Sequence, residues 1–180
     1  MRTFVAVEIR NDEVLNSISK LQSDIKINAK PVSRENTHFT LFFLGEISED
    51  MAKKVMESLS SVSFYPIEVN FTQVGTFPDP RFPRVVWIGV DSVAGKKLEE
   101  LATQVEEKLL PLGFRKDKPF KPHLTIFRIK NRINDISQEL NRFKTIEIGH
   151  DVISELKFKK SILTPDGPIY SDLQVVKAKQ

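Results

Sequence analysis

Two histidines, His38 and His123, each begin an apolar run, and each is followed two residues later by a threonine, Thr40 or Thr125. The runs read His-Phe-Thr-Leu-Phe-Phe and His-Leu-Thr-Ile-Phe-Arg. Aromatic and β-branched residues at this density are typical of strands. Because side chains at i and i+2 lie on one face of a strand, each histidine should point the same way as its threonine. The fold must therefore contain two similar strands, one in each half of the chain, and each must present a histidine and a threonine on one face.

The elements expected around these two strands follow the same order in both halves. Apolar spacing predicts a helix from Val14 to Ile25 capped by Asn11 or Asp12, a second capped by Ser48, and a long third capped by Asp91 or Ser92. A shorter fourth helix is expected over residues 133–143. Strands are expected over residues 4–9, 37–44, 67–71, 74–77, 84–90, 122–129, 145–148, 153–163 and 169–176, with a turn at 165–168.

This order predicts an α+β fold of two pseudo-symmetric lobes, each an antiparallel sheet with helices outside, facing each other across a central cleft. A chain of 180 residues fits one domain. We therefore expect a single bilobal domain over residues 1–180, with pseudo-repeats at approximately 1–90 and 85–180. The repeat is inferred from element order and the paired motif, because the two halves share little sequence.

Composition excludes several classes of protein. The chain has no cysteine, which removes disulfides, thiolate nucleophiles and cysteine-based metal sites. No apolar run approaches the roughly 20 residues of a membrane-spanning helix. The N-terminus has no secretory signal, so we expect a cytoplasmic protein with no membrane partner.

The net charge of +3 is small, but its distribution is uneven. Residues 115–132 contain seven lysines and arginines and one aspartate, so this window carries +6 and the remainder −3. Such a run is most often solvated surface. Around His123 it also favours an interaction with phosphate.

Two imidazoles and two hydroxyls facing one cleft suit metal-free cleavage of a phosphodiester. Histidine ordinarily titrates near pH 6.5, so one ring can act as base while the other acts as acid near neutrality. Threonine hydroxyls can hold the non-bridging phosphate oxygens. No acidic cluster or His-Glu-x-x-His pattern is present, so we expect no metal and no cofactor. The third histidine, His150, lacks the threonine, lies in an expected turn and is given no catalytic role.

The chain resembles the RNA 2′,3′-cyclic phosphodiesterases, also called 2′-5′ RNA ligases, of the two-histidine phosphoesterase superfamily. The likeness covers nearly the whole chain, and the two His-x-Thr boxes are its most specific mark. The segments that carry it are residues 2–6, 35–46, 77–78, 83–90, 118–128 and 161–170.

This resemblance implies hydrolysis of RNA 2′,3′-cyclic phosphate ends to 2′-phosphates without metal, and reversible ligation that forms 2′-5′ linkages. It implies that His38 is the proton donor, His123 the proton acceptor, and that Thr40 and Thr125 hold the phosphate. The implied partner is an RNA 3′ end, tRNA fragments included. The sequence by itself leaves open which histidine is acid and which is base.

The resemblance also implies a phosphate clamp at Arg128 and a base-stacking ring at Phe43, each five residues after a histidine. Strand alternation places an offset of five on the opposite face unless the strand bulges or ends. Two departures from the family pattern, Ala29-Lys30 in place of Arg-Trp and Lys118 in place of arginine, bear on substrate affinity, since lysine keeps the charge but loses the bidentate geometry.

Two alternatives remain open at this point. The protein can be a non-catalytic module that binds RNA ends through its basic window, or a phosphodiesterase for another small cyclic nucleotide. The histidine pair favours an enzyme, because binding alone needs no acid and base. No heptad pattern or long apolar edge argues against a monomer, which is the state we expect.

Overall fold

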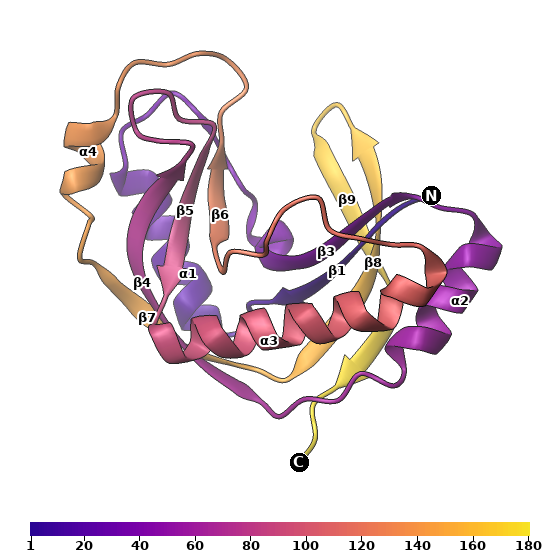
Figure 1. The fold of residues 1–180 in the computed structure, drawn as a ribbon. Coiled ribbons are helices and arrows are strands. Elements are labelled where there is room, and N and C mark those ends of the chain that lie inside the picture. Colours follow the sequence, from indigo (N-terminus) through magenta and orange to yellow (C-terminus); the bar gives the residue numbers. More distant parts are fainter.

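Nine strands form two antiparallel sheets, and the helices pack outside them (Figure 1). The computed structural model describes every residue from Met1 to Gln180. The strands are β1 (Arg2–Glu8), β2 (Lys30–Pro31), β3 (His38–Glu46), β4 (Ile67–Phe77), β5 (Val85–Val90), β6 (Leu124–Arg128), β7 (Glu147–Ile153), β8 (Glu155–Thr164) and β9 (Gly167–Lys177). The helices are α1 (Asp12–Asp24), α2 (Glu49–Leu59), α3 (Ser92–Leu109) and α4 (Ser137–Asn141).

The two sheets have related strand orders. The four-stranded sheet has the order β3-β1-β8-β9, and the five-stranded sheet has the order β2-β6-β5-β4-β7. In the four-stranded sheet, β3, which carries His38, pairs with β1, the first strand of the N-terminal half. In the five-stranded sheet, β6, which follows His123, pairs with β5, the first strand of the C-terminal half. Each sheet also takes strands from the other half of the chain, so the two lobes do not coincide with the two halves of the sequence.

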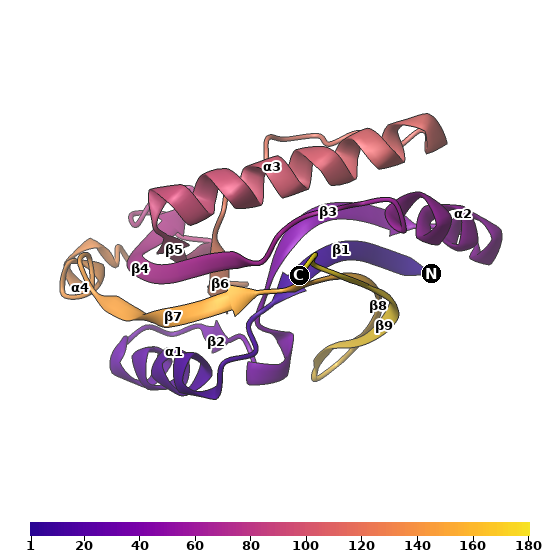
Figure 2. The same cartoon turned by 90° about the horizontal axis from the view of Figure 1, so that it is seen from below.

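One continuous apolar core joins the two sheets. It comprises 39 buried residues drawn from both sheets and from the helices. The rings of Phe39 on β3 and Phe71 on β4 stack at 6.1 Å between centroids and so link one sheet to the other. Helix α3 runs across the molecule and contacts both β3 and β4 (Figure 2). The α+β fold of two facing antiparallel sheets is therefore confirmed.

The predicted helix caps are also confirmed. The Asn11 side chain accepts hydrogen bonds from the first amides of α1, Ser48 accepts from the Met51 amide of α2, and Asp91 accepts from the Ala94 amide of α3. These bonds satisfy amide groups that have no partner inside their own helix. None of the helices is long and apolar enough to cross a membrane.

Several predicted boundaries are wrong. Residues 67–71 and 74–77 are one strand, β4, because Gln73 with φ 68° forms a bulge and the pairing with β5 continues past it. Strand β6 begins at Leu124 rather than at residue 122. The helix expected over 133–143 is shortened to α4, because the Asp135 carboxylate accepts a hydrogen bond from the Ser137 amide and so competes with helix formation before Ser137.

The expected turn at Gly149-His150-Asp151 is also wrong. These residues lie within β7 and pair with residues 69–71 of β4. Strand pairing overrides the turn tendency of this sequence, with Gly149 taking a φ of 154°. The Asp151 carboxylate accepts hydrogen bonds from the amides of Arg10 and Asn11, which join the end of β1 to β7.

We expect Gly75→Ala to lower the free energy of unfolding by about 1–3 kcal/mol, the usual cost of overpacking. A methyl group at this position would lie 2.3 Å from Cζ2 of Trp87. The matched control is Gly95→Ala, where the nearest atom is Cγ of Pro122 at 3.4 Å. Because Gly95 lies inside α3, alanine there should be neutral or stabilising. Equal denaturant midpoints for the two variants would contradict this view of the Trp87 contact.

Candidate active site

The residues of the two His-x-Thr boxes line one cavity between the sheets. His38 and Thr40 come from β3, while His123 immediately precedes β6 and Thr125 lies within it. Their intervening residues point the other way, since Phe39, Leu41, Leu124 and Ile126 are almost fully buried. The cavity has a volume of about 270 Å³. The predicted alternation along both strands therefore brings the four side chains to a shared space.

Both imidazoles are held by the same backbone contact. His38 Nδ1 lies 2.8 Å from the carbonyl oxygen of Asn36, and His123 Nδ1 lies 2.6 Å from that of Lys121. In each case the acceptor is two residues before the histidine. A carbonyl can only accept, so Nδ1 carries the proton and donates it, and in the neutral ring Nε2 keeps its lone pair. This leaves Nε2 of each ring as the atom available for proton transfer.

The hydroxyl of Thr40 lies 3.0 Å from Nε2 of His38. With a neutral ring the hydroxyl donates to Nε2. When the ring is protonated, Nε2–H donates to the hydroxyl oxygen instead, and the hydroxyl proton becomes free for another acceptor. The protonation of His38 is thus coupled to the direction in which Thr40 donates.

Aromatic rings pack against both histidines. His38 stacks on Phe4 with ring centroids 5.1 Å apart and meets the edge of Tyr170 at 5.3 Å. His123 meets the edge of Phe77 at 4.9 Å, and Phe77 in turn packs on Trp87. These contacts fix ring orientation and exclude water from one side of each imidazole.

Burial keeps both histidines neutral at pH 7. It lowers the pKa of His38 to about 4; the bond to the Asn36 carbonyl opposes this shift, and the charges of Lys159 and Arg128 add to it. Burial also lowers the pKa of His123, opposed by the Lys121 carbonyl and assisted by Arg128. The expectation of ordinary titration near pH 6.5 is therefore wrong for both rings, because packing removes the water that would stabilise the imidazolium.

β3 and β6 each have a bulge three residues after the histidine, and these bulges determine the side on which Phe43 and Arg128 lie. The pairing of β3 with β1 skips Leu41, and the pairing of β6 with β5 skips Ile126. Leu41 and its follower Phe42 are both buried, as are Ile126 and Phe127. The bulge resets the alternation, so the fifth residue returns to the side of the histidine.

Arg128 and Phe43 lie in different surroundings, although both are on the histidine side of their strands. Arg128 lines the cavity together with the histidines. Phe43 lies outside the cavity lining and is 51% exposed, with the guanidinium of Arg2 over its ring at 4.7 Å. The structure thus brings Arg128 to the predicted site and leaves Phe43 on the neighbouring surface of the four-stranded sheet.

The hairpin between β8 and β9 contributes residues that the sequence reasoning did not single out. Tyr170 lines the cavity, and the tip of the hairpin is tied to β2 of the five-stranded sheet and to the segment before β3. Lys30 Nζ donates to the Asp166 carbonyl at 2.8 Å, and Asn36 Nδ2 donates to the Pro168 carbonyl at 3.2 Å. The alternation of β9, which places residues 168 and 170 on one face, was the available signal for Tyr170.

His150, to which the sequence assigned no catalytic role, is exposed on β7 and does not line the cavity. No three His, Asp or Glu side chains converge closely enough to hold a metal ion.

Comparison with known proteins assigns the chain to a family. The family model for LigT-like phosphoesterases matches twice in succession, over residues 7–87 and 88–170. The chain therefore belongs to the LigT-like phosphoesterase family.

Individual relatives match along nearly the full length. The chain is 41% identical to a protein of Archaeoglobus fulgidus over 177 residues, which cover 97% of this chain and 99% of that protein. It is 35% identical to a protein of Methanocaldococcus jannaschii over 173 residues, which cover 94% and 96%. Both relatives are named RNA 2′,3′-cyclic phosphodiesterase. The crystal structure of TT0787 of Thermus thermophilus has a similar fold, with a TM-score of 0.83 at 25% identity, covering 98% of this chain and 97% of that chain.

We expect the imidazole NMR signals of His38 to titrate near pH 4 and those of His123 below pH 6.5. Inorganic phosphate in the cavity should raise both pKa values, because an adjacent anion favours the imidazolium. Signals are assigned by substituting each of the three histidines by asparagine in turn. Titration of either ring at or above pH 6.5 without phosphate would contradict the burial that the structure gives it.

Proposed function

We propose that this protein hydrolyses the 2′,3′-cyclic phosphate at RNA 3′ ends to a 2′-phosphate, using His38 and His123 as an acid–base pair and no metal. The observation that carries the proposal is that two imidazoles present Nε2 to one cavity together with two hydroxyls and Arg128. The names of the archaeal relatives support the substrate class.

In the proposed reaction, His123 Nε2 takes a proton from water as the water oxygen bonds to phosphorus. The bond between phosphorus and the 3′ oxygen breaks, and His38 Nε2–H protonates that oxygen. The products are a 2′-phosphate monoester and a 3′ hydroxyl. Thr40, Thr125 and Arg128 hold the non-bridging oxygens as negative charge develops on them.

The two roles place different demands on the protein before substrate binds. A base must be unprotonated, and His123 already meets this requirement at pH 7. A proton donor must be charged, whereas burial lowers the pKa of His38 to about 4. The anionic cyclic phosphate supplies the missing stabilisation of the imidazolium. His38 thus gains its proton with the substrate, and the Thr40 hydroxyl becomes free to donate to phosphate.

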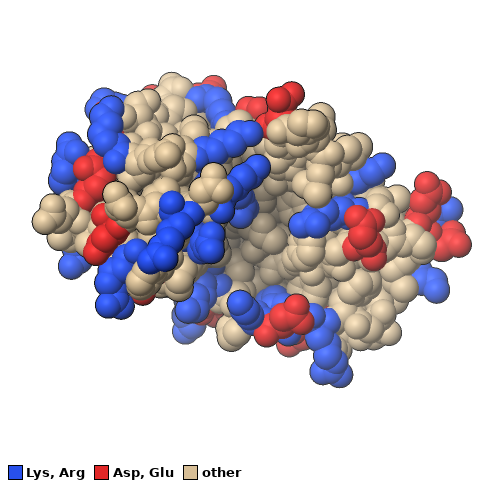
Figure 3. Space-filling model, turned by 90° about the horizontal axis from the view of Figure 1, so that it is seen from above, with Lys and Arg blue, Asp and Glu red and all other residues tan.

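The charge around the cavity fits an RNA partner. Lys30, Arg128 and Lys130 line it. Seen from above, Lys and Arg side chains gather beside the central hollow, mainly on the lobe of the five-stranded sheet (Figure 3). A basic rim attracts the phosphates of the strand that ends in the cavity. RNA is therefore favoured over an isolated cyclic nucleotide. Ligation would use the same groups in the same roles: His123 would take the proton of a 5′ hydroxyl in place of water, and His38 would protonate the departing 3′ oxygen.

We expect His38→Ala and His123→Ala each to reduce hydrolysis of an RNA oligomer ending in a 2′,3′-cyclic phosphate by about 10²–10⁴-fold, the usual contribution of a general acid or base. With the wild-type protein and EDTA, product analysis should show the 2′-phosphate as the only product. The matched control is His150→Ala, since His150 is exposed on β7 and should leave turnover unchanged.

Three outcomes would contradict the proposal. A 3′-phosphate product would show that the 2′ oxygen leaves. Loss of hydrolysis with EDTA would show a metal requirement. Absence of turnover by folded protein that still binds the RNA end would favour a binding module, and in that case the two alanine variants would keep their RNA affinity.

A further inference from the structure

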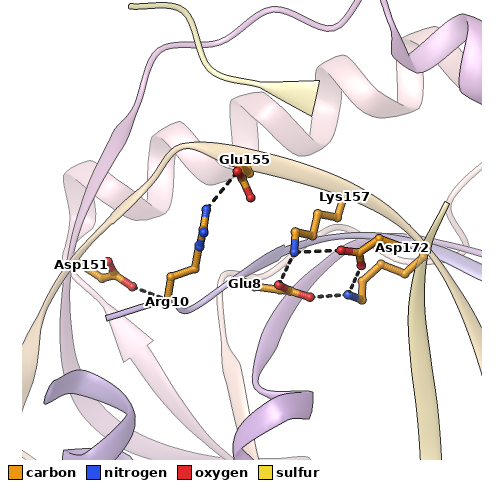
Figure 4. Close-up of polar contacts among 7 residues, drawn as sticks. Glu8, Arg10, Asp151, Glu155, Lys157 and Asp172 are labelled. Carbon is orange, nitrogen blue, oxygen red and sulfur yellow. Dashed lines mark hydrogen bonds and ion pairs between the residues drawn. The ribbon is translucent and has the colours of Figure 1, made fainter. Parts of the chain in front are cut away.

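Four charged side chains form a closed ring of ion pairs on the four-stranded sheet (Figure 4). Lys157 Nζ lies 2.8 Å from Glu8 Oε2 and 3.0 Å from Asp172 Oδ2. Lys159 bridges the other oxygens of the same two carboxylates. The ring joins β1, β8 and β9, and its formal charge is zero.

The ring is partly buried: the Lys159 side chain is only 6% exposed, whereas that of Asp172 is 35% exposed. Burial alone would raise the pKa of Glu8 and of Asp172, but the two ammonium groups hold both values below the ordinary range. Burial alone would lower the pKa of Lys157, but the two carboxylates raise it. Because apolar side chains often stabilise a fold as well as a buried ion pair does, stability alone is a weak reason for this arrangement.

Its position beside His38 indicates another role. Glu8 on β1 is the direct cross-strand partner of His38 on β3, so the two side chains leave the same face of the sheet. Lys159 is the cross-strand partner of Phe4, whose ring stacks on His38. The ring of charges therefore lies next to the imidazole, on the same face of the sheet.

Charged and titratable groups around His38 come from several strands. Glu8 on β1, Lys159 on β8 and Arg128 on β6 act on its charge, Tyr170 on β9 meets its ring, and His123 lines the same cavity. Lys157 on β8 and Asp172 on β9 are ion-paired to Glu8 and Lys159. Lys159 and Arg128 disfavour the imidazolium, whereas Glu8 favours it.

We propose that the charge-balanced ring of Glu8, Lys157, Lys159 and Asp172 sets the proton affinity of the His38 imidazole, which makes these four positioning residues for the proton donor. With the ring neutral, burial dominates and His38 stays unprotonated until an anion enters. The catalytic role of the ring rests on the proposed function, in which His38 is the proton donor. The effect of the ring on the proton affinity of His38 can be measured without any substrate.

The test removes charges from the ring one at a time and follows the titration of His38 by NMR. Glu8→Gln leaves a net positive ring, so the pKa of His38 should fall by about one unit. Lys159→Met leaves a net negative ring and should raise this pKa by about one unit. The two single variants therefore shift the same residue in opposite directions, which a purely structural role would not do.

A double variant and a matched control complete the design. Glu8→Gln combined with Lys159→Met keeps the ring neutral, so the pKa of His38 should return close to its original value even where a single variant folds poorly. The control is Glu155→Gln, which breaks the ion pair of Glu155 Oε1 with Arg10 Nη1 at 2.9 Å on the same strand (Figure 4). Glu155 and Lys159 share one strand face but Glu155 lies outside the ring, so this control should leave the pKa and the hydrolysis rate unchanged.

Shifts of opposite sign with recovery in the double variant would support the proposal, as would a matching displacement of the pH profile of kcat/KM. Unchanged titration in folded single variants, shifts of the same sign, or a double variant without recovery would overturn it. Opposite shifts in a protein without cyclic phosphate hydrolysis would leave the ring's role intact and overturn the proposed function instead.

Discussion

The hydrogen bond from each histidine Nδ1 to the carbonyl two residues earlier is the interaction on which the site depends. It acts at Asn36 for His38 and at Lys121 for His123. By fixing the tautomer, it leaves Nε2 of each ring unprotonated and available to the cavity, while the packed aromatic rings hold the orientation. The two lobes thus share the same histidine-to-carbonyl hydrogen bond although their sequences differ.

The second constraint is burial. Phe4 and Tyr170 enclose His38, and Phe77 covers one side of His123. Removing water lowers both pKa values, so that before substrate binds the site holds a pair of bases rather than an acid and a base. In the proposed mechanism an anionic substrate raises the pKa of His38, so the protonation of the donor is a consequence of binding. In this account the ion-pair ring beside His38 controls how strongly that proton is held.

Period-two alternation was enough to predict from sequence that each histidine and its threonine share a face. Residue type predicted the cap at Ser48 and narrowed the other two caps to Asn11 or Asp12 and to Asp91 or Ser92, of which the structure has Asn11 and Asp91. The side to which Arg128 and Phe43 turn was not predictable, because it depends on bulges that arise only when β3 meets β1 and β6 meets β5. The pairing of Glu8 with Lys159 spans 151 positions and has no local signal. The strand at 149–151 was missed for a related reason: its pairing with β4 outweighs its turn-forming residues.

The most direct test of the central claim is the protonation state of the imidazole nitrogens in the ligand-free protein at pH 7. A two-bond ¹⁵N–¹H correlation spectrum distinguishes the two neutral tautomers and the imidazolium. The account predicts that His38 and His123 both carry hydrogen on Nδ1 and a lone pair on Nε2. Hydrogen on Nε2 of either ring, or a charged ring, would contradict it.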